Sequence, residues 1–182
     1  LTNSALEKVY NTIINNGKIL FISTKKQASE AISQLAKDTD QYFVNYRWLG
    51  GMLTNWGTIS NSIKKLKKIN VDLVAENRGF TKKELLKMSV KKDKLQRSLG
   101  GISEMKKVPD LVFIIDTNYE SLAIQESVKL GIPIIAILPE FGSTEFVREC
   151  QEGHRTFVVH VNHLPQINQE FEKSMIFLKF YF

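Results

Sequence analysis

Cysteine is nearly absent from this chain, and membrane-spanning runs and glycine-rich phosphate loops are absent altogether. The single cysteine, Cys150, excludes an internal disulfide framework and a cysteine-based zinc site, and it is consistent with a reducing compartment. The one long apolar run, residues 132–138, contains a proline and is too short to cross a bilayer. Neither a Gly-x-Gly-x-x-Gly fingerprint nor a Walker-type Gly-Lys-Ser/Thr loop occurs. We therefore expect no disulfide scaffold, no membrane partner and no ordinary nucleotide-binding loop.

Basic residues are concentrated in one part of the chain. Residues 54–107 contain fourteen Lys and Arg against five Asp and Glu, whereas the rest has eleven against fourteen, and together they give the net charge of +6. This asymmetry is typical of a protein that holds a polyanion against one surface, where phosphate contacts supply affinity but little sequence information. A solvated, lysine-rich helical face would give the same count. Charge alone leaves both interpretations open.

Short apolar runs alternate with segments of helical periodicity, within a length that suffices for one sizeable core. The runs are typical of buried parallel strands and are expected at residues 18–23, 42–45, 111–115, 133–138 and 156–161. Helices are expected around residues 6–14, 25–35, 119–130 and 167–178, the second of them capped by Ser23 and Thr24. The pattern predicts an α/β fold with a five-stranded parallel sheet.

A long lysine-rich segment interrupts this alternation. Apolar residues step by three and four along residues 53–69 and again along residues 85–99, which predicts two antiparallel helices in a coiled-coil hairpin. Lys92 falls on the second apolar stripe, where its flexible stem can reach solvent. We expect an inserted hairpin over residues 54–98, with residues 1–53 and 99–182 forming the sheet domain.

The stretch from Asn45 to Trp56 combines an arginine, both tryptophans of the chain and a glycine pair. Gly50-Gly51 gives a backbone that tolerates positive φ or a close approach, while Arg47 and the tryptophans offer a guanidinium fork and stacking faces. The stretch also follows the carboxyl end of an expected strand, where open α/β sheets hold ligands. Such a combination suits a surface fitted to structured RNA. Two buried core anchors would explain the tryptophans equally well.

This stretch resembles the signature of the ribosomal protein S2 family of bacterial and organellar small ribosomal subunits. Further matches follow in the family's order between about Leu1 and Leu138: Gly17-Lys18-Ile19-Leu20-Phe21, Thr24-Lys25-Lys26-Gln27-Ala28-Ser29-Glu30, Thr81-Lys82-Lys83-Glu84-Leu85-Leu86, Ser98-Leu99-Gly100-Gly101-Ile102, Asp116-Thr117-Asn118 and Leu130-Gly131-Ile132-Pro133. The resemblance implies a flavodoxin-like sheet with an inserted helical hairpin. It further implies that the protein binds small-subunit ribosomal RNA between the head and the body of the subunit, near other small-subunit proteins.

Three features depart from the family pattern. The family's aromatic and basic N-terminal segment does not precede Leu1, which suggests that the true terminus lies before it. Tyr46 stands where the family usually has histidine, and Pro139-Glu140-Phe141-Gly142 replaces an Asp-Thr-Asn loop.

The resemblance implies a non-catalytic RNA-binding protein with no cofactor, no metal and no small-molecule substrate. The residues expected at the RNA are Lys25, Lys26, Asn45, Tyr46, Arg47, Trp48, Gly50, Gly51, Thr54, Asn55, Trp56, Lys64, Lys65, Lys67, Lys68 and Arg97.

An α/β enzyme acting on a phosphorylated or nucleic-acid substrate is the alternative, with Asp116 and Lys25 near the switch point of the sheet. Asp116 is more simply explained as a cap of the following helix. The histidines at positions 154, 160 and 163 lack convincing metal-ligand spacing and are interpreted as surface residues or as residues whose hydrogen bonds are satisfied internally.

The run Thr81 to Leu86 resembles the alphaproteobacterial and mitochondrial versions of the family. We predict a mitochondrial ribosome, with the bacterial cytoplasm as the alternative.

Overall fold

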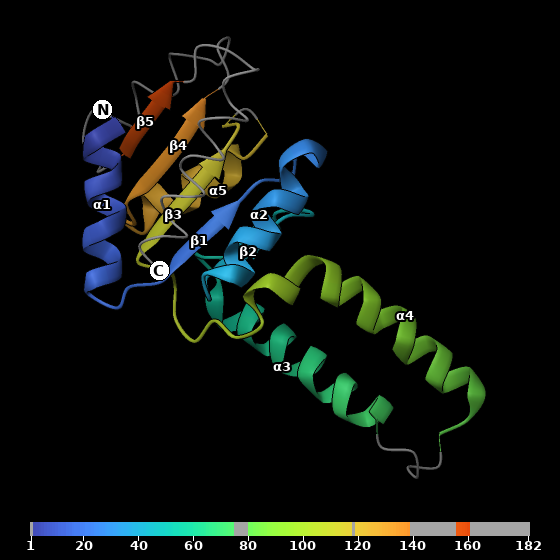
Figure 1. Ribbon diagram of the computed structural model, residues 1–182. Helices are drawn as coiled ribbons and strands as arrows, with labels where there is room; N and C mark the ends of the chain where they lie inside the picture. Colours follow the sequence, from blue (N-terminus) through green and yellow to red (C-terminus); the bar gives the residue numbers. More distant parts are fainter. Residues whose placement is uncertain (1, 75–79, 118, 139–155, 161–182) are drawn as a thin grey trace.

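The computed structural model describes residues 2–74, 80–117, 119–138 and 156–160, and its helices alternate with strands (Figure 1). The elements are α1 (Thr2–Ile14), β1 (Ile19–Ile22), α2 (Lys26–Asp38), β2 (Tyr42–Val44), α3 (Trp56–Val74), α4 (Lys82–Leu99), η1 (Gly100–Ile102), β3 (Leu111–Ile115), α5 (Ser121–Lys129), β4 (Ile134–Leu138) and β5 (Thr156–His160). The predicted α/β fold with a parallel sheet flanked by helices is confirmed. Cys150, His154, His163 and the helix expected over residues 167–178 lie outside the described residues.

The described strands form one sheet in the order β2-β1-β3-β4-β5, and every neighbouring pair is parallel. This is the strand order of flavodoxin-like sheets, in which the direction of winding reverses between β1 and β3. The carboxyl ends of these two strands therefore form the topological switch point. Because parallel strands need crossover connections, helices lie on both faces of the sheet (Figure 1).

Successive residues of β1 serve opposite faces of the sheet. Ile19 and Phe21 belong to a buried cluster with apolar residues of α1 and α2, whereas Leu20 and Ile22 belong to a second cluster with residues of α5, α3 and η1. All four side chains are buried, so the strand needs apolar residues at every position. This double burial explains why the sequence shows a continuous apolar run there.

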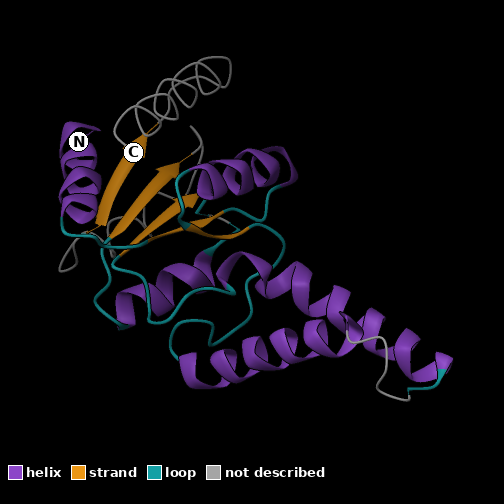
Figure 2. Ribbon diagram, turned by 60° about the horizontal axis from the view of Figure 1, so that its bottom comes forward, coloured by secondary structure: helices purple, strands orange, loops and turns teal. Residues whose placement is uncertain are grey.

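Helices α3 and α4 lie side by side and extend away from the sheet (Figure 2). The predicted apolar stripe on α3 is buried at Ile59, Ile63, Leu66 and Ile69. On α4, burial decreases with distance from the sheet: Leu99 is buried, Leu95 is half-buried and Leu85 is exposed. Thr81 and Glu84 form a capping box that satisfies the first backbone N–H groups of α4.

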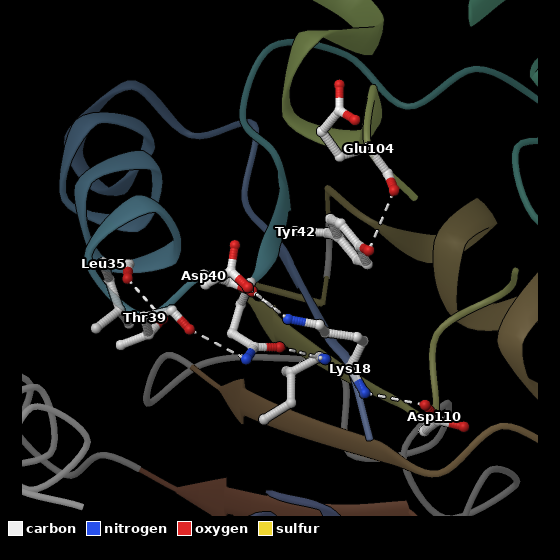
Figure 3. A network of polar contacts seen from close by, with 9 residues as sticks. Lys18, Leu35, Thr39, Asp40, Tyr42, Glu104 and Asp110 are labelled. Atoms are coloured by element: carbon white, nitrogen blue, oxygen red, sulfur yellow. Dashed lines mark hydrogen bonds and ion pairs between the residues drawn. The ribbon is translucent and has the colours of Figure 1, made fainter. Parts of the chain in front are cut away.

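Polar contacts join the strands at the amino edge of the sheet (Figure 3). The backbone N–H of Lys18 donates to Asp110 Oδ2 at 2.9 Å, and its ammonium donates to the carbonyl and the carboxylate of Asp40 at 2.7 and 2.8 Å. Tyr42 donates its hydroxyl to the carbonyl of Glu104 at 3.3 Å. Because most of these side chains reach solvent, this edge is tied together without burying a charge.

Two predicted helix caps are wrong. The N-cap of α2 is Lys25, and neither Lys25 nor the preceding hydroxyls form a side-chain cap. Asp116 does not cap α5, because that helix begins at Ser121 with Glu120 as its N-cap, and the Asp116 carboxylate contacts Lys25 instead. None of the helices within the described ranges is both long and apolar enough to traverse a membrane.

Candidate nucleic-acid interface

The signature loop, residues 45–55, leaves the carboxyl end of β2 and leads into α3. Backbone hydrogen bonds from Met52 N to Leu49 O (3.0 Å) and from Asn55 N to Gly51 O (2.8 Å) fold it tightly. Gly51 has a φ of +82°, and a Cβ there would stand 3.2 Å from that of Asn55. A Cβ at Gly50 would meet no described atom within 4 Å. The turn therefore requires glycine at position 51, while position 50 is open toward the surroundings.

A carboxylate from α5 holds this loop from the inside. Glu126 Oε1 accepts hydrogen bonds from the indole Nε1 of Trp48 at 3.0 Å and from Gly51 N at 2.7 Å. Its Oε2 accepts from Leu53 N at 2.9 Å and from both the backbone N and the hydroxyl of Thr54 at 3.0 Å. Glu126 was missed by the sequence analysis, although it stands three positions after the buried Ala123, on the apolar side of its helix.

Glu126 is 9% exposed and forms no ion pair with the described residues. Burial by itself raises the pKa of its carboxyl, but hydrogen bonds from the Thr54 backbone, the Trp48 indole and the backbones of Leu53 and Gly51 outweigh that effect. The pKa therefore lies below its ordinary value. The side chain is an ionised carboxylate stabilised by neutral donors.

The predicted RNA-binding residues of the loop divide between its two sides. Tyr46, Arg47, Gly50, Thr54 and Asn55 are exposed. Arg47 makes no hydrogen bond or ion pair with the described residues, so its guanidinium is free to meet an external acceptor.

The two tryptophans serve as core anchors rather than as exposed stacking faces. Trp48 is 8% exposed and lies in the core cluster, and Trp56 is half-buried against the same cluster. Because the Trp48 ring is buried in the core, it is not presented for stacking on a base, and its indole N–H is bound to Glu126. Trp48 therefore shapes the loop from below.

Asn45 and the first turn of α2 are joined to each other. Ser29 donates its hydroxyl to the carbonyl of Asn45 at 3.0 Å, and the Asn45 amide donates back to the Ser29 carbonyl at 3.4 Å. Lys26, in that turn, is exposed. These bonds fix the entry of the signature loop next to a free lysine.

The lysine row of α3, comprising Lys64, Lys65, Lys67 and Lys68, is exposed along its length. The buried isoleucines and leucine of α3 face the other way, so helical periodicity turns this row outward. Lys67 forms an exposed ion pair with Glu104 at 3.0 Å. Arg97, near the end of α4, is also exposed. The loop leads directly into α3, and the lysine row lies near the middle of that helix, which extends away from the sheet (Figure 1).

Lys25 and Asp116, the pair on which the enzymatic alternative depends, meet at the switch point. Lys25 Nζ lies 3.0 Å from Asp116 Oδ2, and the carboxylate is buried. Asp116 adopts a φ of 68°, and its Oδ1 has no hydrogen-bond partner in the part of the chain that the structure describes. No cluster of three or more metal-ligating side chains occurs in those same residues. The pair is an ion contact between two residues of the sheet domain.

Comparisons with known proteins agree with the sequence resemblance. Residues 1–146 match the family described as "Ribosomal protein S2". Over 138 residues, the chain is 56% identical to the small ribosomal subunit protein uS2 of Bartonella henselae and 54% identical to the proteins of that name from Brucella ovis and Brucella suis. Each match covers 76% of this chain and 54% of the relative, so the chain spans about half the length of the curated relatives it matches.

Proposed function

Since the chain belongs to the ribosomal protein S2 family, we propose that it is a non-catalytic component of the small ribosomal subunit that binds ribosomal RNA and neighbouring ribosomal proteins. The observation that carries the proposal is the exposure of the polar residues of the signature loop and of the lysine row on α3, the helix that follows the loop. An unpaired guanidinium, an open glycine and a row of ammonium groups together suit phosphates and the backbone of structured RNA.

The proposed RNA-binding residues differ in how free their side chains are to contact RNA. Arg47 is positioned to bind phosphate or to stack on a base, since it is exposed and without an internal partner among the described residues. Lys64, Lys65 and Lys68 supply charge, while Lys67 must leave Glu104 before it can contribute fully. Lys25 is already paired with Asp116, and Trp48 is buried, so both support the surface without touching the RNA. The other proposed contacts are Lys26, Tyr46, Gly50, Thr54, Asn55 and Arg97.

The hairpin is proposed to act as an inserted unit of residues 54–98, whose two helices interlock as a coiled coil. The buried stripe of α3 and the half-buried Met88 and Leu95 of α4 support this packing. The relatives named above are bacterial, which favours the bacterial cytoplasm over the mitochondrion as the compartment of its ribosome.

Binding of the chain to transcribed small-subunit ribosomal RNA, measured over a range of salt concentrations, tests the proposal. Replacing Lys64, Lys65, Lys67 and Lys68 with glutamine should weaken binding and flatten its salt dependence. Each lost phosphate contact should lower the slope of log affinity against log salt by about 0.7 to 0.9. An unchanged slope would mean that the lysine row faces solvent or protein.

A matched control separates position from net charge. Replacing Lys82, Lys83, Lys87 and Lys91 of α4 with glutamine removes the same charge from exposed positions on the other helix. The proposal expects a smaller loss of affinity from this variant than from the α3 variant. In parallel, the chain should sediment with small ribosomal subunits and leave them at high salt; a chain that stays free in every condition contradicts the proposed function.

A further inference from the structure

Arg47 stands between two anchored neighbours. On one side, Asn45 exchanges two hydrogen bonds with Ser29 of α2. On the other side, Trp48 is buried and donates its indole N–H to Glu126. The exposed guanidinium thus projects from a short backbone segment whose two ends are fixed. The direction of Arg47 depends on the Glu126 anchor more than on any contact of its own.

The same carboxylate occupies the donors with which the loop itself would bind an anion. The backbone N–H groups of Gly51, Leu53 and Thr54 converge on Glu126, together with an indole N–H and a hydroxyl. Such a convergence of backbone N–H groups is the ordinary form of a phosphate-binding loop. Here an internal anion from α5 fills it, so these donors are not available to an RNA phosphate, which would meet the exposed groups on the outer face.

We propose that Glu126 is a positioning residue for RNA recognition: its ionised carboxylate turns the donors of the signature loop inward and holds Arg47 in its outward, binding-competent position. The inference rests on the proposed function and adds to it a residue remote from the RNA-facing surface.

The charge of Glu126 is essential to this role. An ionised carboxylate offers two acceptor oxygens with about four lone pairs to the five donors of the loop, whereas the amide of glutamine has one acceptor oxygen and an NH₂ group that donates. Glu126→Gln keeps the shape of the side chain but leaves buried N–H groups without acceptors. The loop should therefore reorganise, and Arg47 should lose its fixed direction while remaining chemically intact.

A double-mutant cycle on RNA binding tests the proposal with the parent chain, Glu126→Gln, Arg47→Ala and the double variant. Arg47→Ala should weaken binding to transcribed small-subunit ribosomal RNA about tenfold and lower the salt slope by about one unit. Glu126→Gln should weaken binding by a similar factor. In the Arg47→Ala background it should cost no more than about twofold, because the group that it positions is gone. Additive losses in the double variant would overturn the inference.

Two further measurements separate positioning from general loss of structure. In spectra of the folded chain, the indole N–H resonance of Trp48 should move in Glu126→Gln while that of Trp56 stays in place. Glu120→Gln is the matched control, since Glu120 is also a buried carboxylate near the start of α5, but it accepts from Thr24 N and does not touch the signature loop. An equal loss of RNA binding in Glu120→Gln would overturn the inference.

If Glu126→Gln does not fold, Trp48→Phe takes its place in the cycle, because it removes one donor to the carboxylate and keeps an apolar ring in the core. Its loss of binding should be smaller and should again vanish in the Arg47→Ala background; full additivity would count against positioning. A parent chain that binds no ribosomal RNA refutes the proposed function itself, and the inference with it. A parent that binds normally alongside an additive cycle refutes only the role of Glu126.

Discussion

The two ends of the α3 and α4 hairpin are held in different ways. At its base, Ile59, Ile63 and Leu99 are at most 8% exposed and share a core cluster with residues of the sheet. Toward its tip, Val71, Leu86 and Val90 are 58%, 67% and 61% exposed. The base is therefore part of the core of the sheet domain, whereas each helix at the tip has chiefly the other helix to pack against.

This difference predicts that the tip of the hairpin opens more easily than its base. A helix pair that buries little surface opens locally at low cost, whereas elements within the main core open only with the whole domain. The signature loop and Glu126 lie at the base. The signature loop is consequently held by the core of the sheet domain, and sequence change should be better tolerated at the tip.

The comparison predicts its largest effect for truncation of a buried side chain at the base. Ile63→Ala should destabilise the chain by about 2–5 kcal/mol, because it removes apolar surface and leaves a cavity in the core cluster. Leu86→Ala, at the tip, should change stability by no more than about 0.5 kcal/mol, since that side chain is mostly exposed. Urea unfolding of both variants measures the difference. Equal effects would mean that base and tip form one cooperative unit.

A second prediction concerns the junction of the hairpin with β2. A Cβ at Gly101 would lie against the carbonyl oxygen of Phe43 and 2.8 Å from its ring, and a strand carbonyl cannot swing aside. Gly101→Ala should therefore cost about 1–3 kcal/mol through overpacking. Gly57→Ala is the control: a Cβ there meets no described atom within 4 Å, and alanine favours the helix by up to about 1 kcal/mol. Similar melting temperatures for the two variants would contradict the close contact at the junction.

Low pH should lower the free energy of unfolding by protonating Glu126, which holds the signature loop at the sheet end of the hairpin. Because the pKa of Glu126 in the folded chain lies below its usual value of 4.5, its carboxylate contributes stability that is fully present above that value and is lost as the pH falls through the folded pKa. The gap in unfolding free energy between the parent and Glu126→Gln should stay constant from neutral pH to about pH 5 and narrow below it.

Urea titrations at stepped pH values measure this gap. The pKa values of Asp110 and Glu84 are also lowered, but both residues are present in parent and variant, so their contributions cancel in the difference. A gap that does not change between pH 5 and pH 3 would contradict a contribution from the ionised carboxylate of Glu126.

The smallest effect is expected for an exposed contact near the base. Lys67 and Glu104 form an ion pair at 3.0 Å, but their side chains are 49% and 76% exposed. Lys67→Gln should therefore change stability by about 0–1 kcal/mol, and less at high salt. A loss as large as that of Ile63→Ala, measured by the same unfolding assay, would show that electrostatics rather than apolar burial holds the hairpin to the sheet.

Much of the fold was accessible from the sequence because a strand such as β1 is buried on both faces. A strand such as β1 needs an apolar residue at every position, whereas a helix needs one every three or four residues. A short stretch of sequence is therefore enough to tell the two kinds of element apart. The outward direction of the lysine row follows from the same local periodicity. The caps were less predictable: Ser23 and Asp116 are residue types that cap helices, but Asp116 pairs with Lys25, which stands far away in the sequence.

In the candidate site, composition found the signature loop but did not assign the roles of its members. Trp48 and Arg47 are adjacent and both suit RNA, yet one is buried and the other exposed. Glu126 carried one weak signal, a carboxylate on the apolar side of a helix. Its partners lie 72 to 78 residues earlier, and no local pattern connects such positions.

By itself, the sequence determined the α/β fold, the order of its elements and the placement of basic charge on one face of α3, because each depends on residues within a few positions of one another. Only the tertiary structure decided which tryptophan is unavailable for stacking, which glycine the turn requires, and that a carboxylate from α5 fills the anion-binding side of the loop. Those properties depend on which distant segments meet when the sheet closes over its core, and the burial that accompanies their meeting sets the hydrogen bonds of Glu126.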